Sequence, residues 1–365
     1  MQVVFLISTL GPGGAERSIT QLAARWARAG HRVALVTLHS EVKDDFYPVF
    51  EGIERRSLAG SAVRGGFLGN LLLVWRCAAL YRALHPRVVV SFIDRTNVIA
   101  ILAALLTGHP VIACERTVPG VRFIGTMWEF LRRRLYRYAA AVVVQSERAK
   151  KALDWLEDAA VIPNAVEEPQ GSAPAPEIPA PYLVLVGRFT EEKRHEMALK
   201  CFKQATMGEF SAWRLVCIGD GPLKPALEQM AASLGIADQV LFLGTLANPH
   251  PVIARAAFLV STSRVEGFPM AVAEALALGV PVVATDSGGG VSDLVRTEVD
   301  GIIVPRDDES ALVEALHRII SAPALRERLA SRTKEVLERF SAECVDAQWF
   351  ELIESLDMVR GSSHE

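Results

Sequence analysis

The stretch STSRVEGFPMAVAEALALGVPVVATDSGGG, residues 261–290, decides the fold class of this chain. It starts at the end of an apolar run, passes through a loop with Pro269, continues as an apolar helical segment, and reaches the strand-like run PVVAT. Strand, helix and strand in this order predict a β-α-β unit with two parallel strands. Two carboxylates, Glu266 and Glu274, stand eight positions apart in this unit. Because acids are rarely buried unpaired, the pair calls for a ligand or a partner.

The same alternation continues in both directions and forms two series. Strand-like apolar runs alternate with helical patterns at 3–8, 32–38, 87–93, 110–114 and 140–146, and again at 182–187, 214–219, 240–244, 258–263 and 281–285. Strands separated by helices are typical of parallel sheets covered on both faces. The sequence therefore predicts an α/β fold with two Rossmann-like, doubly wound parallel-sheet domains.

A proline-rich segment separates the two series. Residues 167–181, EEPQGSAPAPEIPAP, contain five prolines and few large apolar side chains, as expected of a semi-rigid linker. We therefore predict an N-terminal domain over 1–166, a C-terminal domain over 182–341, and a last helix within 342–365 that packs back on the first domain. Because open α/β sheets bind ligands beyond the carboxyl ends of their strands, the two domains are expected to face a cleft.

Composition narrows the function classes. Acidic and basic residues are interspersed and give a net charge of −3 over 365 residues, which argues against a nucleic-acid partner. The five cysteines are scattered, which suits a reducing compartment. The N-terminus has no basic region before its apolar run, so we expect a first strand and a cytoplasmic protein. The apolar stretches at 65–81 and 98–106 fall short of the ~18 uncharged residues that span a membrane, but peripheral contact stays open.

A glycine loop follows the first strand. GPGGAERS places Gly13 and Gly14 before an amphipathic helix, where backbone can approach an anionic ligand closely. A tight turn without a ligand is the alternative. Glu16 stands where a dinucleotide-binding fingerprint needs its third glycine, so an NAD-dependent oxidoreductase is disfavoured.

Two cations open the second series. LVGRFTEEKRHEMAL puts Arg188 after a strand and Lys193 at the start of the next helix, and such charges suit a departing diphosphate. A solvated basic helix start is the alternative. Gly219, in CIGDGPLKPALE, belongs to a further strand, glycine turn and helix, which alone is a weak signal.

The spacing of the two glutamates suggests the length of the ligand. On one helix, eight positions separate Glu266 from Glu274 by about 12 Å. Paired carboxylates of retaining glycosidases need roughly 5 to 5.5 Å. The spacing fits the two hydroxyl-bearing ends of a nucleotide-sugar. The backbone N–H groups of Phe268, Met270 and Ala271 would face the phosphates, and the preceding Gly267 would belong to the same donor site. A loop carboxylate plus an exposed helical glutamate is the alternative.

These segments resemble the retaining glycosyltransferases of family 4, which have the GT-B architecture of two Rossmann-like domains facing a cleft. The resemblance covers nearly the whole chain and rests on the ordered motifs GPGGAERS, SFIDRTN, VVVQSERAKKAL, VIPNAV, LVGRFTEEKR, IGDGPLKPALE and VEGFPMAVAEALALG. It implies that the N-terminal domain takes the acceptor and that the C-terminal domain takes the nucleotide-sugar.

The resemblance also assigns roles to residues. It places Glu266 at the donor sugar, Glu274 at the ribose, and Arg188 and Lys193 at the diphosphate. The loop with Gly13 and Gly14 would approach the sugar and phosphate. The family implies no metal and no cofactor beyond a UDP-sugar substrate, and RDDE at 306–309 is interpreted as a surface turn.

One departure from the family lies in the first domain. Many members carry a histidine after the fourth strand, whereas this chain has Glu115 and Arg116. That pair and SFIDRTN are most similar to transferases that elongate undecaprenyl-pyrophosphate-linked oligosaccharides. The implied acceptor is a lipid-linked glycan at the inner face of the cytoplasmic membrane, with Asp94 or Glu115 orienting it.

Two helices are candidates for contact with the membrane or the acceptor. FIGTMWEFLRRRLYRYA, 123–139, puts Arg132, Arg133 and Arg137 away from an apolar face, a pattern that suits an anionic membrane or a pyrophosphate. The apolar face is formed by Ile124, Trp128, Leu131, Leu135 and Tyr138. A core helix with a solvated cationic face is the alternative. The segment 67–84 is apolar nearly all round and suits either lipid contact or burial.

The predicted reaction is transfer of a hexose or N-acetylhexosamine from a UDP-sugar to a glycan acceptor, with retention. A UDP-sugar epimerase of the same architecture and a non-catalytic nucleotide-sugar-binding protein are the alternatives.

Overall fold

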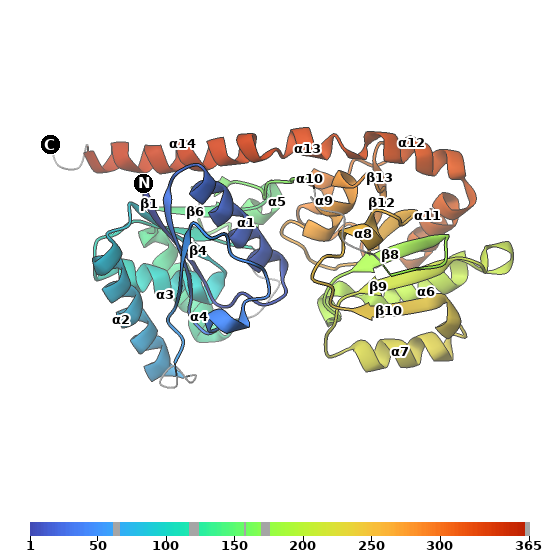
Figure 1. Ribbon diagram of the computed structural model, residues 1–365, viewed down its shortest axis with the longest axis horizontal. Coiled ribbons are helices and arrows are strands. Elements are labelled where there is room, and N and C mark those ends of the chain that lie inside the picture. The colour runs from blue at the N-terminus through green and yellow to red at the C-terminus, as the bar shows by residue number, and fades with distance from the viewer. Residues whose placement is uncertain (61–65, 117–123, 157, 169–175, 362–365) are drawn as a thin grey trace. The chain divides into compact units, whose positions relative to one another are not determined.

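The computed structural model describes residues 1–60, 66–116, 124–156, 158–168 and 176–361, and it divides into two compact units (Figure 1). Unit 1 comprises Met1–Asn164 with Ala347–Glu365, and unit 2 comprises Ala165–Asp346. Most of the expected linker, 169–175, lies outside the described residues. Each unit is an open parallel sheet with helices, so the predicted class of two Rossmann-like α/β domains is confirmed.

Unit 1 is built on a seven-stranded sheet in the order β3-β2-β1-β4-β5-β6-β7, and its strand pairings are parallel. The strands are β1 (Gln2–Ile7), β2 (Arg32–Thr37), β3 (Ile53–Ser57), β4 (Val88–Phe92), β5 (Val111–Cys114), β6 (Ala141–Val144) and β7 (Ala159–Val161). The sequence did not predict β3 or β7. Strand β3, IERRS, is polar because it lies at the sheet edge, and β7 has only three residues.

The connections of unit 1 contain α1 (Gly14–Arg28), α2 (Phe67–Leu84), α3 (Asp94–Leu105), α4 (Thr126–Leu135) and α5 (Glu147–Lys151). A 3-10 turn, η3 (Tyr136–Tyr138), follows α4. Helices α2 and α4 both pack against α3. In the described part of the chain, α2 is the one helix that is long and apolar enough to cross a membrane, and 39% of it is buried inside the structure.

Unit 2 is built on a six-stranded parallel sheet in the order β10-β9-β8-β11-β12-β13. Its strands are β8 (Tyr182–Val186), β9 (Arg214–Ile218), β10 (Val240–Gly244), β11 (Phe258–Ser261), β12 (Val282–Thr285) and β13 (Gly301–Val304). Its helices are α6 (His195–Ala205), α7 (Lys224–Ser233), α8 (His250–Ile253), α9 (Met270–Ala277), α10 (Val291–Leu294), α11 (Glu309–Ser321), α12 (Pro323–Thr333) and α13 (Val336–Arg339).

The last helix, α14 (Ala342–Gly361), contributes its later residues to unit 1. Trp349 is buried and packs edge to face on Trp26 of α1, with ring centroids 6.0 Å apart. Phe350 contacts the same indole at 5.2 Å, and Arg87 pairs with Asp357. Aromatic pairs of this kind stabilise a core beyond the area they bury. The C-terminal segment is thus part of the core of unit 1.

Candidate active site

In each unit, the sheet has one point where neighbouring strands send their connections in opposite directions. In unit 1 it lies between β1 and β4, and in unit 2 between β8 and β11. Open α/β sheets bind ligands at this switch point, beyond the carboxyl ends of the strands. The residues that follow these four strands are therefore the candidates for a ligand site.

At the switch point of unit 2, an ion pair joins the loops after β8 and β11. The ammonium of Lys193 contacts Oε1 of Glu266, and the two side chains are 20% and 16% exposed. Lys193 ends a 3-10 turn, η4 (Glu191–Lys193), and Glu266 lies between β11 and α9. The structure thus brings together two residues that stand 73 positions apart in the sequence.

Backbone contacts hold the two loops in place. The hydroxyl of Thr262 donates to the carbonyl oxygens of Lys193 and Arg194, both at 2.9 Å. The N–H of Arg264 donates to the carbonyl of Glu192 at 2.8 Å. Because three bonds tie the loop after β8 to the loop after β11, the Lys193–Glu266 pair is preorganised, as a charge-stabilising site requires.

The loop after β8 carries two further cations, Arg188 and Arg194, which contact different partners. Arg188 is 62% exposed, and its guanidinium lies 3.9 Å from the Glu192 carboxylate. Arg194 takes a left-handed backbone conformation, with φ at 50°, and pairs with Asp307. Arg188 is therefore exposed at the site, whereas Arg194 binds the loop before α11.

Glu274 occupies a different environment from Glu266. It lies on α9, is 7% exposed, and has its Oε2 3.4 Å from Nε2 of His250, the first residue of α8. Because Glu266 lies before α9 begins at Met270, a spacing measured along one helix does not apply to the pair. The alternative of an exposed helical glutamate is wrong, because Glu274 is a buried carboxylate with a histidine beside it.

Close backbone approach explains two glycines of unit 2. At Gly219, φ is +140°, and an added Cβ would lie 2.0 Å from the carbonyl oxygen of Gly187. At Gly290, an added Cβ would lie 2.6 Å from the carbonyl oxygen of Gly267. Phe268 packs its ring on Phe340 in the core, so only its backbone can face a ligand. Gly219 is therefore required for packing whether or not it also contacts a donor.

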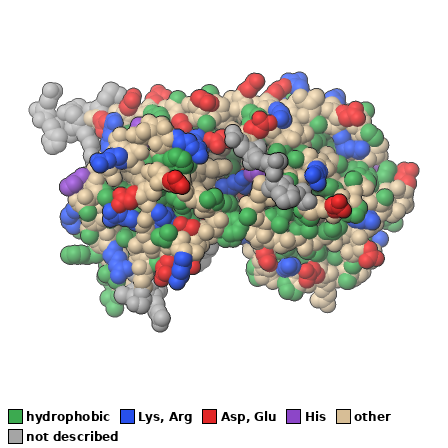
Figure 2. All heavy atoms as spheres, in the orientation of Figure 1, with side chains coloured by type: hydrophobic (Ala, Val, Ile, Leu, Met, Phe, Trp, Pro, Cys, Tyr) green, Lys and Arg blue, Asp and Glu red, His purple; other side chains and the backbone are tan. Residues whose placement is uncertain are grey.

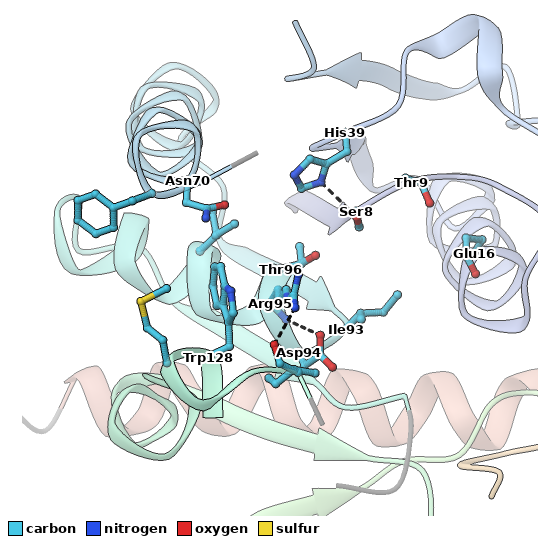
Figure 3. Close-up of a pocket in the computed structure, with 15 residues that line it drawn as sticks. Ser8, Thr9, Glu16, His39, Asn70, Ile93, Asp94, Arg95, Thr96 and Trp128 are labelled. Atoms are coloured by element: carbon cyan, nitrogen blue, oxygen red, sulfur yellow. Dashed lines mark hydrogen bonds between the residues drawn. The ribbon is translucent and has the colours of Figure 1, made fainter. Parts of the chain in front are cut away.

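At the switch point of unit 1 lies a cavity of about 620 Å³ (Figure 3). Ser8 and Thr9 follow β1, and Ile93 to Thr96 follow β4 and open α3. Its lining, which mixes polar and aromatic side chains, also includes Glu16, His39, Asn70, Met127 and Trp128. In Figure 3 the Trp128 ring and Asn70 stand on one side, and His39 and Ser8 on the other. Aromatic faces together with acids and amides are suited to binding a sugar.

Asp94 reaches this cavity through a strained backbone. Ile93 has φ at +78°, a conformation that β-branched residues rarely adopt. Such strain costs on the order of 1–3 kcal/mol and is concentrated at functional sites. Asp94 follows as the first residue of α3, is 8% exposed, and accepts from the N–H of Arg95 at 2.6 Å. Of the three acceptor-side candidates, Asp94 is among the described residues lining the cavity, whereas Glu115 and Arg116 are not.

Glu115 belongs to a buried network at the end of β5. Its carboxylate accepts from the Tyr136 hydroxyl and lies 3.6 Å from the Arg132 guanidinium. The Asn97 amide donates to the same hydroxyl at 3.0 Å, and Arg132 also binds Glu129 at 2.7 Å. Burial raises the pKa of Glu115 to about 7 against the opposing pull of Arg132. The network connects β5, α3, α4 and η3.

Arg116 is buried as well. Its guanidinium donates to Oδ1 of Asn164 at 2.8 Å and stacks 3.6 Å from the Phe92 ring centroid. The Ser18 hydroxyl donates to the same Asn164 oxygen at 2.6 Å. Burial lowers the pKa of Arg116 to about 10, still far above neutrality. Arg116 is thus a buried cation that connects β5 to the VIPNAV segment.

One expectation about α4 is wrong. Arg132 does not lie on an outer cationic face: it is 4% exposed, because its two acidic partners draw it inward. Arg133 and Arg137 are exposed, with guanidinium groups 5.8 Å from the Trp155 ring and 5.0 Å from the Tyr138 ring. Gly13 caps α1 and Gly14 begins it, while Glu16, in the first turn of the same helix, lines the cavity.

Several residues of these sites were not predicted. No sequence pattern indicates His39 and Asn70 in the cavity, or His250 beside Glu274, because tertiary packing alone brings them there. Trp128 was assigned only to an apolar helix face. In the part of the chain that the structure describes, no cluster of three or more His, Cys, Asp or Glu side chains could hold a metal ion.

Comparison with known proteins agrees with this arrangement. A family model described as Glycosyltransferase Family 4 matches residues 12–168, and one described as Glycosyl transferases group 1 matches residues 174–336. A crystal structure of a mutant of S. aureus TarM, in complex with Fondaparinux, alpha-GlcNAc-glycerol and UDP, superposes with a TM-score of 0.81. It covers 96% of this chain and 99% of that one at 13% identity, which shows the fold.

Two relatives differ in how much of their length the chain covers. The chain is 27% identical over 358 residues to a GalNAc-alpha-(1->4)-GalNAc-alpha-(1->3)-diNAcBac-PP-undecaprenol alpha-1,4-N-acetyl-D-galactosaminyltransferase of Campylobacter jejuni, covering 97% of this chain and 98% of that one. It is 33% identical over 225 residues to an exopolysaccharide phosphotransferase of Streptomyces coelicolor, but this covers only 59% of this chain and 23% of that protein.

The fold and the two family matches define a glycosyltransferase of the GT-B class. Within that class, the chain belongs to the family 4 and group 1 glycosyltransferases, with the family 4 domain in unit 1 and the group 1 domain in unit 2. The protein is therefore a transferase enzyme, and a purely binding function is set aside.

Proposed function

We propose that this enzyme transfers a hexose or N-acetylhexosamine from a UDP-sugar to a lipid-pyrophosphate-linked glycan, with retention at the anomeric carbon. It would act in the synthesis of a cell-surface polysaccharide or glycoconjugate, at the inner face of the cytoplasmic membrane. The observation that carries the proposal is the preorganised Lys193–Glu266 pair at the switch point of unit 2. The C. jejuni relative, whose name specifies an undecaprenol-linked substrate, supports the choice of acceptor.

Unit 2 would hold the donor. Lys193 and the exposed Arg188 supply positive charge for the diphosphate, and Glu266 accepts hydrogen bonds from sugar hydroxyls. Glu274 would accept the hydroxyls of the ribose. A buried carboxylate binds a hydroxyl more strongly than a solvated one does, because water competes less. The TarM neighbour is a complex with UDP, which supports a uridine nucleotide as part of the donor.

Unit 1 would hold the acceptor glycan in its cavity. Trp128 offers a flat apolar face to a sugar ring, while Asp94, Asn70 and His39 offer hydrogen bonds to hydroxyls. Asp94 is the residue that we assign to orient the attacking hydroxyl, because it lines the cavity and Glu115 does not. Correct orientation of a bound nucleophile can account for several kcal/mol of a barrier.

In the transfer step, the acceptor hydroxyl oxygen forms a bond to the anomeric carbon of the donor sugar. The bond from that carbon to the β-phosphate oxygen breaks, UDP leaves with the electron pair, and the hydroxyl proton is released. Negative charge grows on the diphosphate during this step, and Lys193 and Arg188 neutralise it. These two cations would supply the charge stabilisation that other transferases take from a metal ion.

The test is transfer itself. The full chain is incubated with UDP-glucose, UDP-galactose, UDP-GlcNAc or UDP-GalNAc and with a polyprenyl-pyrophosphate glycan, with and without EDTA. We expect one donor to give an extended glycolipid with the donor's anomeric configuration, at a rate that EDTA leaves unchanged. Donor epimerisation without an acceptor, inversion of configuration, or loss of activity in EDTA would each refute a stated part of the proposal.

A matched pair of variants controls for stability. Lys334 and Glu168 also form a Lys–Glu ion pair in unit 2, but their side chains are 57% and 60% exposed. Lys193→Met and Glu266→Gln should abolish transfer, whereas Lys334→Met and Glu168→Gln should retain it. Equal losses of transfer in the variants of both ion pairs would mean that the Lys193–Glu266 pair acts only on folding.

A further inference from the structure

Helix α2 exposes a line of large apolar side chains to solvent. Phe67, Leu68, Leu71 and Trp75 are 66%, 79%, 47% and 70% exposed. At about 100° per residue they fall within an arc of about 100°, so they form one stripe. In Figure 2, hydrophobic side chains project at the lower left, over the place where Figure 1 shows α2. We call Phe67, Leu68, Leu71 and Trp75 the α2 stripe.

The opposite face of α2 is fixed in the core. Leu73, Cys77 and Tyr81 are fully buried, and α2 packs along α3. The helix therefore cannot leave unit 1 to cross a bilayer without exposing that core. A stripe on a helix anchored in this way can contact a bilayer only along its length, which is about 27 Å for 18 residues.

The apolar surface continues to the rim of the acceptor cavity. Phe67 of the α2 stripe and Met127 of α4 both line the cavity, and Met127 is 52% exposed. Phe130, one helical turn further along α4, is 58% exposed. The α2 stripe and the exposed side chains of α4 thus both reach the cavity.

The charge of the two helices favours an anionic surface. Helix α2 contains two arginines and no acidic residue, while α4 and η3 contain four arginines and Glu129. Glu129 is paired with Arg132, whereas Arg133, Arg134 and Arg137 are exposed. The Arg134 guanidinium lies 5.3 Å from the Phe130 ring centroid, which places a cation beside an apolar side chain. Helices that lie in a membrane interface combine these two features.

We propose that the α2 stripe, together with Met127 and Phe130, inserts into the interface of an anionic bilayer and delivers a polyprenyl-linked acceptor to the cavity. The inference rests on the proposed lipid-linked acceptor and specifies the surface that meets the lipid. The exposed arginines contact the anionic headgroups, the stripe enters the acyl boundary, and the glycan extends from the bilayer surface past Phe67 and Met127 to Trp128.

The experiment measures vesicle binding by the full chain without any substrate. Wild type, Leu68→Glu/Trp75→Glu and the control Val42→Glu/Met207→Glu are sedimented with phosphatidylcholine vesicles, with and without phosphatidylglycerol. Val42 and Met207 are 50% and 65% exposed but lie outside the stripe, so the control adds the same charge to other surfaces. We expect the stripe variant to lose about tenfold or more in binding to the anionic vesicles, and the control to match wild type.

Transfer assays separate this inference from the proposed function. With a short-chain, water-soluble pyrophosphate glycan, the stripe variant should turn over as wild type does, because neither Leu68 nor Trp75 lines the cavity. With a long-chain acceptor in vesicles, it should be slower by about the same factor as its loss of binding. If the wild type transfers sugar to neither acceptor, the proposed function is refuted. The sedimentation result would still test whether the α2 stripe binds lipid.

Two outcomes would overturn the inference. One is equal vesicle binding by wild type and the stripe variant. The other is a wild type that self-associates in sedimentation velocity and becomes monomeric in the stripe variant without a change in vesicle binding. The second outcome would assign the α2 stripe to a contact between copies of the chain.

Discussion

The two units have related sheets, but the surfaces at their switch points differ in chemical character. In unit 2 the loops after β8 and β11 are closely packed and carry a Lys–Glu ion pair, with a glycine at a backbone contact that leaves no room for a side chain. In unit 1 the residues after β1 and β4 line a cavity with an aromatic wall and an apolar rim. The topology determines where a ligand binds, and the few residues after each strand determine which kind. A charged, close-fitting surface suits a diphosphate, while an open amphiphilic one suits a glycolipid.

The largest expected effect is on the charged pair of unit 2. Lys193→Met removes the preorganised cation that would stabilise the leaving diphosphate. The turnover number should therefore fall by about a thousandfold. The measurement is the rate of UDP release at a saturating acceptor concentration. Lys334→Met, from the exposed ion pair, is measured as the control. Turnover within a few-fold of wild type would remove Lys193 from the transfer step.

A smaller effect is expected in the cavity of unit 1. Trp128→Ala removes the flat face from the acceptor site and should raise the acceptor KM about tenfold or more. Asp94→Asn removes the carboxylate that orients the attacking hydroxyl, so it should raise the acceptor KM by a similar factor and also lower the turnover number. The donor KM should stay unchanged. A rise in the donor KM alone would place the donor in unit 1 and reverse the assignment of the units.

Glu274 offers a sharper test of the nucleotide site. If its buried carboxylate accepts a ribose hydroxyl, Glu274→Gln should weaken UDP binding about tenfold. Wild type should prefer UDP to 2′-deoxy-UDP, and the variant should prefer it much less. An undiminished preference in the variant would mean that Glu274 acts through His250 or the fold and does not touch the ribose.

The smallest effect concerns the stability of unit 1. Burial raises the pKa of Glu115 to about 7 in the folded state, above its ordinary value of 4.5. Below pH 4.5 the carboxyl is protonated in both states, and as pH rises from 4.5 to 7 the unfolded chain loses its proton first. Stability is therefore lost over this window and changes no further above pH 7.

Glu115→Gln removes this dependence. The melting temperature of the variant, relative to wild type, should rise as pH rises from 5 to 7. Thermal melts at intervals of pH, with exposed Glu54→Gln as the control in the same unit, measure the difference. A difference that does not vary with pH would mean that Glu115 is ionised in the fold throughout the range.

Much of this arrangement could be predicted from the sequence, for physical reasons. The buried strands are β-branched runs between glycine turns, so both sheets were evident apart from the edge strands β3, β7 and β13. Polar residues hide the pattern of β3, while β7 and β13 have only three and four residues. The resemblance to family 4 assigned Lys193 and Glu266 to one donor, and the structure brings the two side chains into contact.

What could not be predicted depends on packing between distant elements. Helical periodicity placed Arg132 outside, yet Glu115, 17 positions earlier on another element, draws it into the core. Trp128 showed helical periodicity, but only the fold places it opposite His39 in the cavity. Periodicity shows that a side chain leaves a helix on a given face, and it carries no information about what lies there.

Calorimetric titration of UDP into wild type, Lys193→Met and Trp128→Ala tests the division of labour between the units most directly. We expect Lys193→Met to weaken UDP binding by about tenfold or more and Trp128→Ala to leave it within twofold of wild type. Equal UDP affinity in wild type and Lys193→Met, or a loss confined to Trp128→Ala, would contradict the assignment of the donor to unit 2.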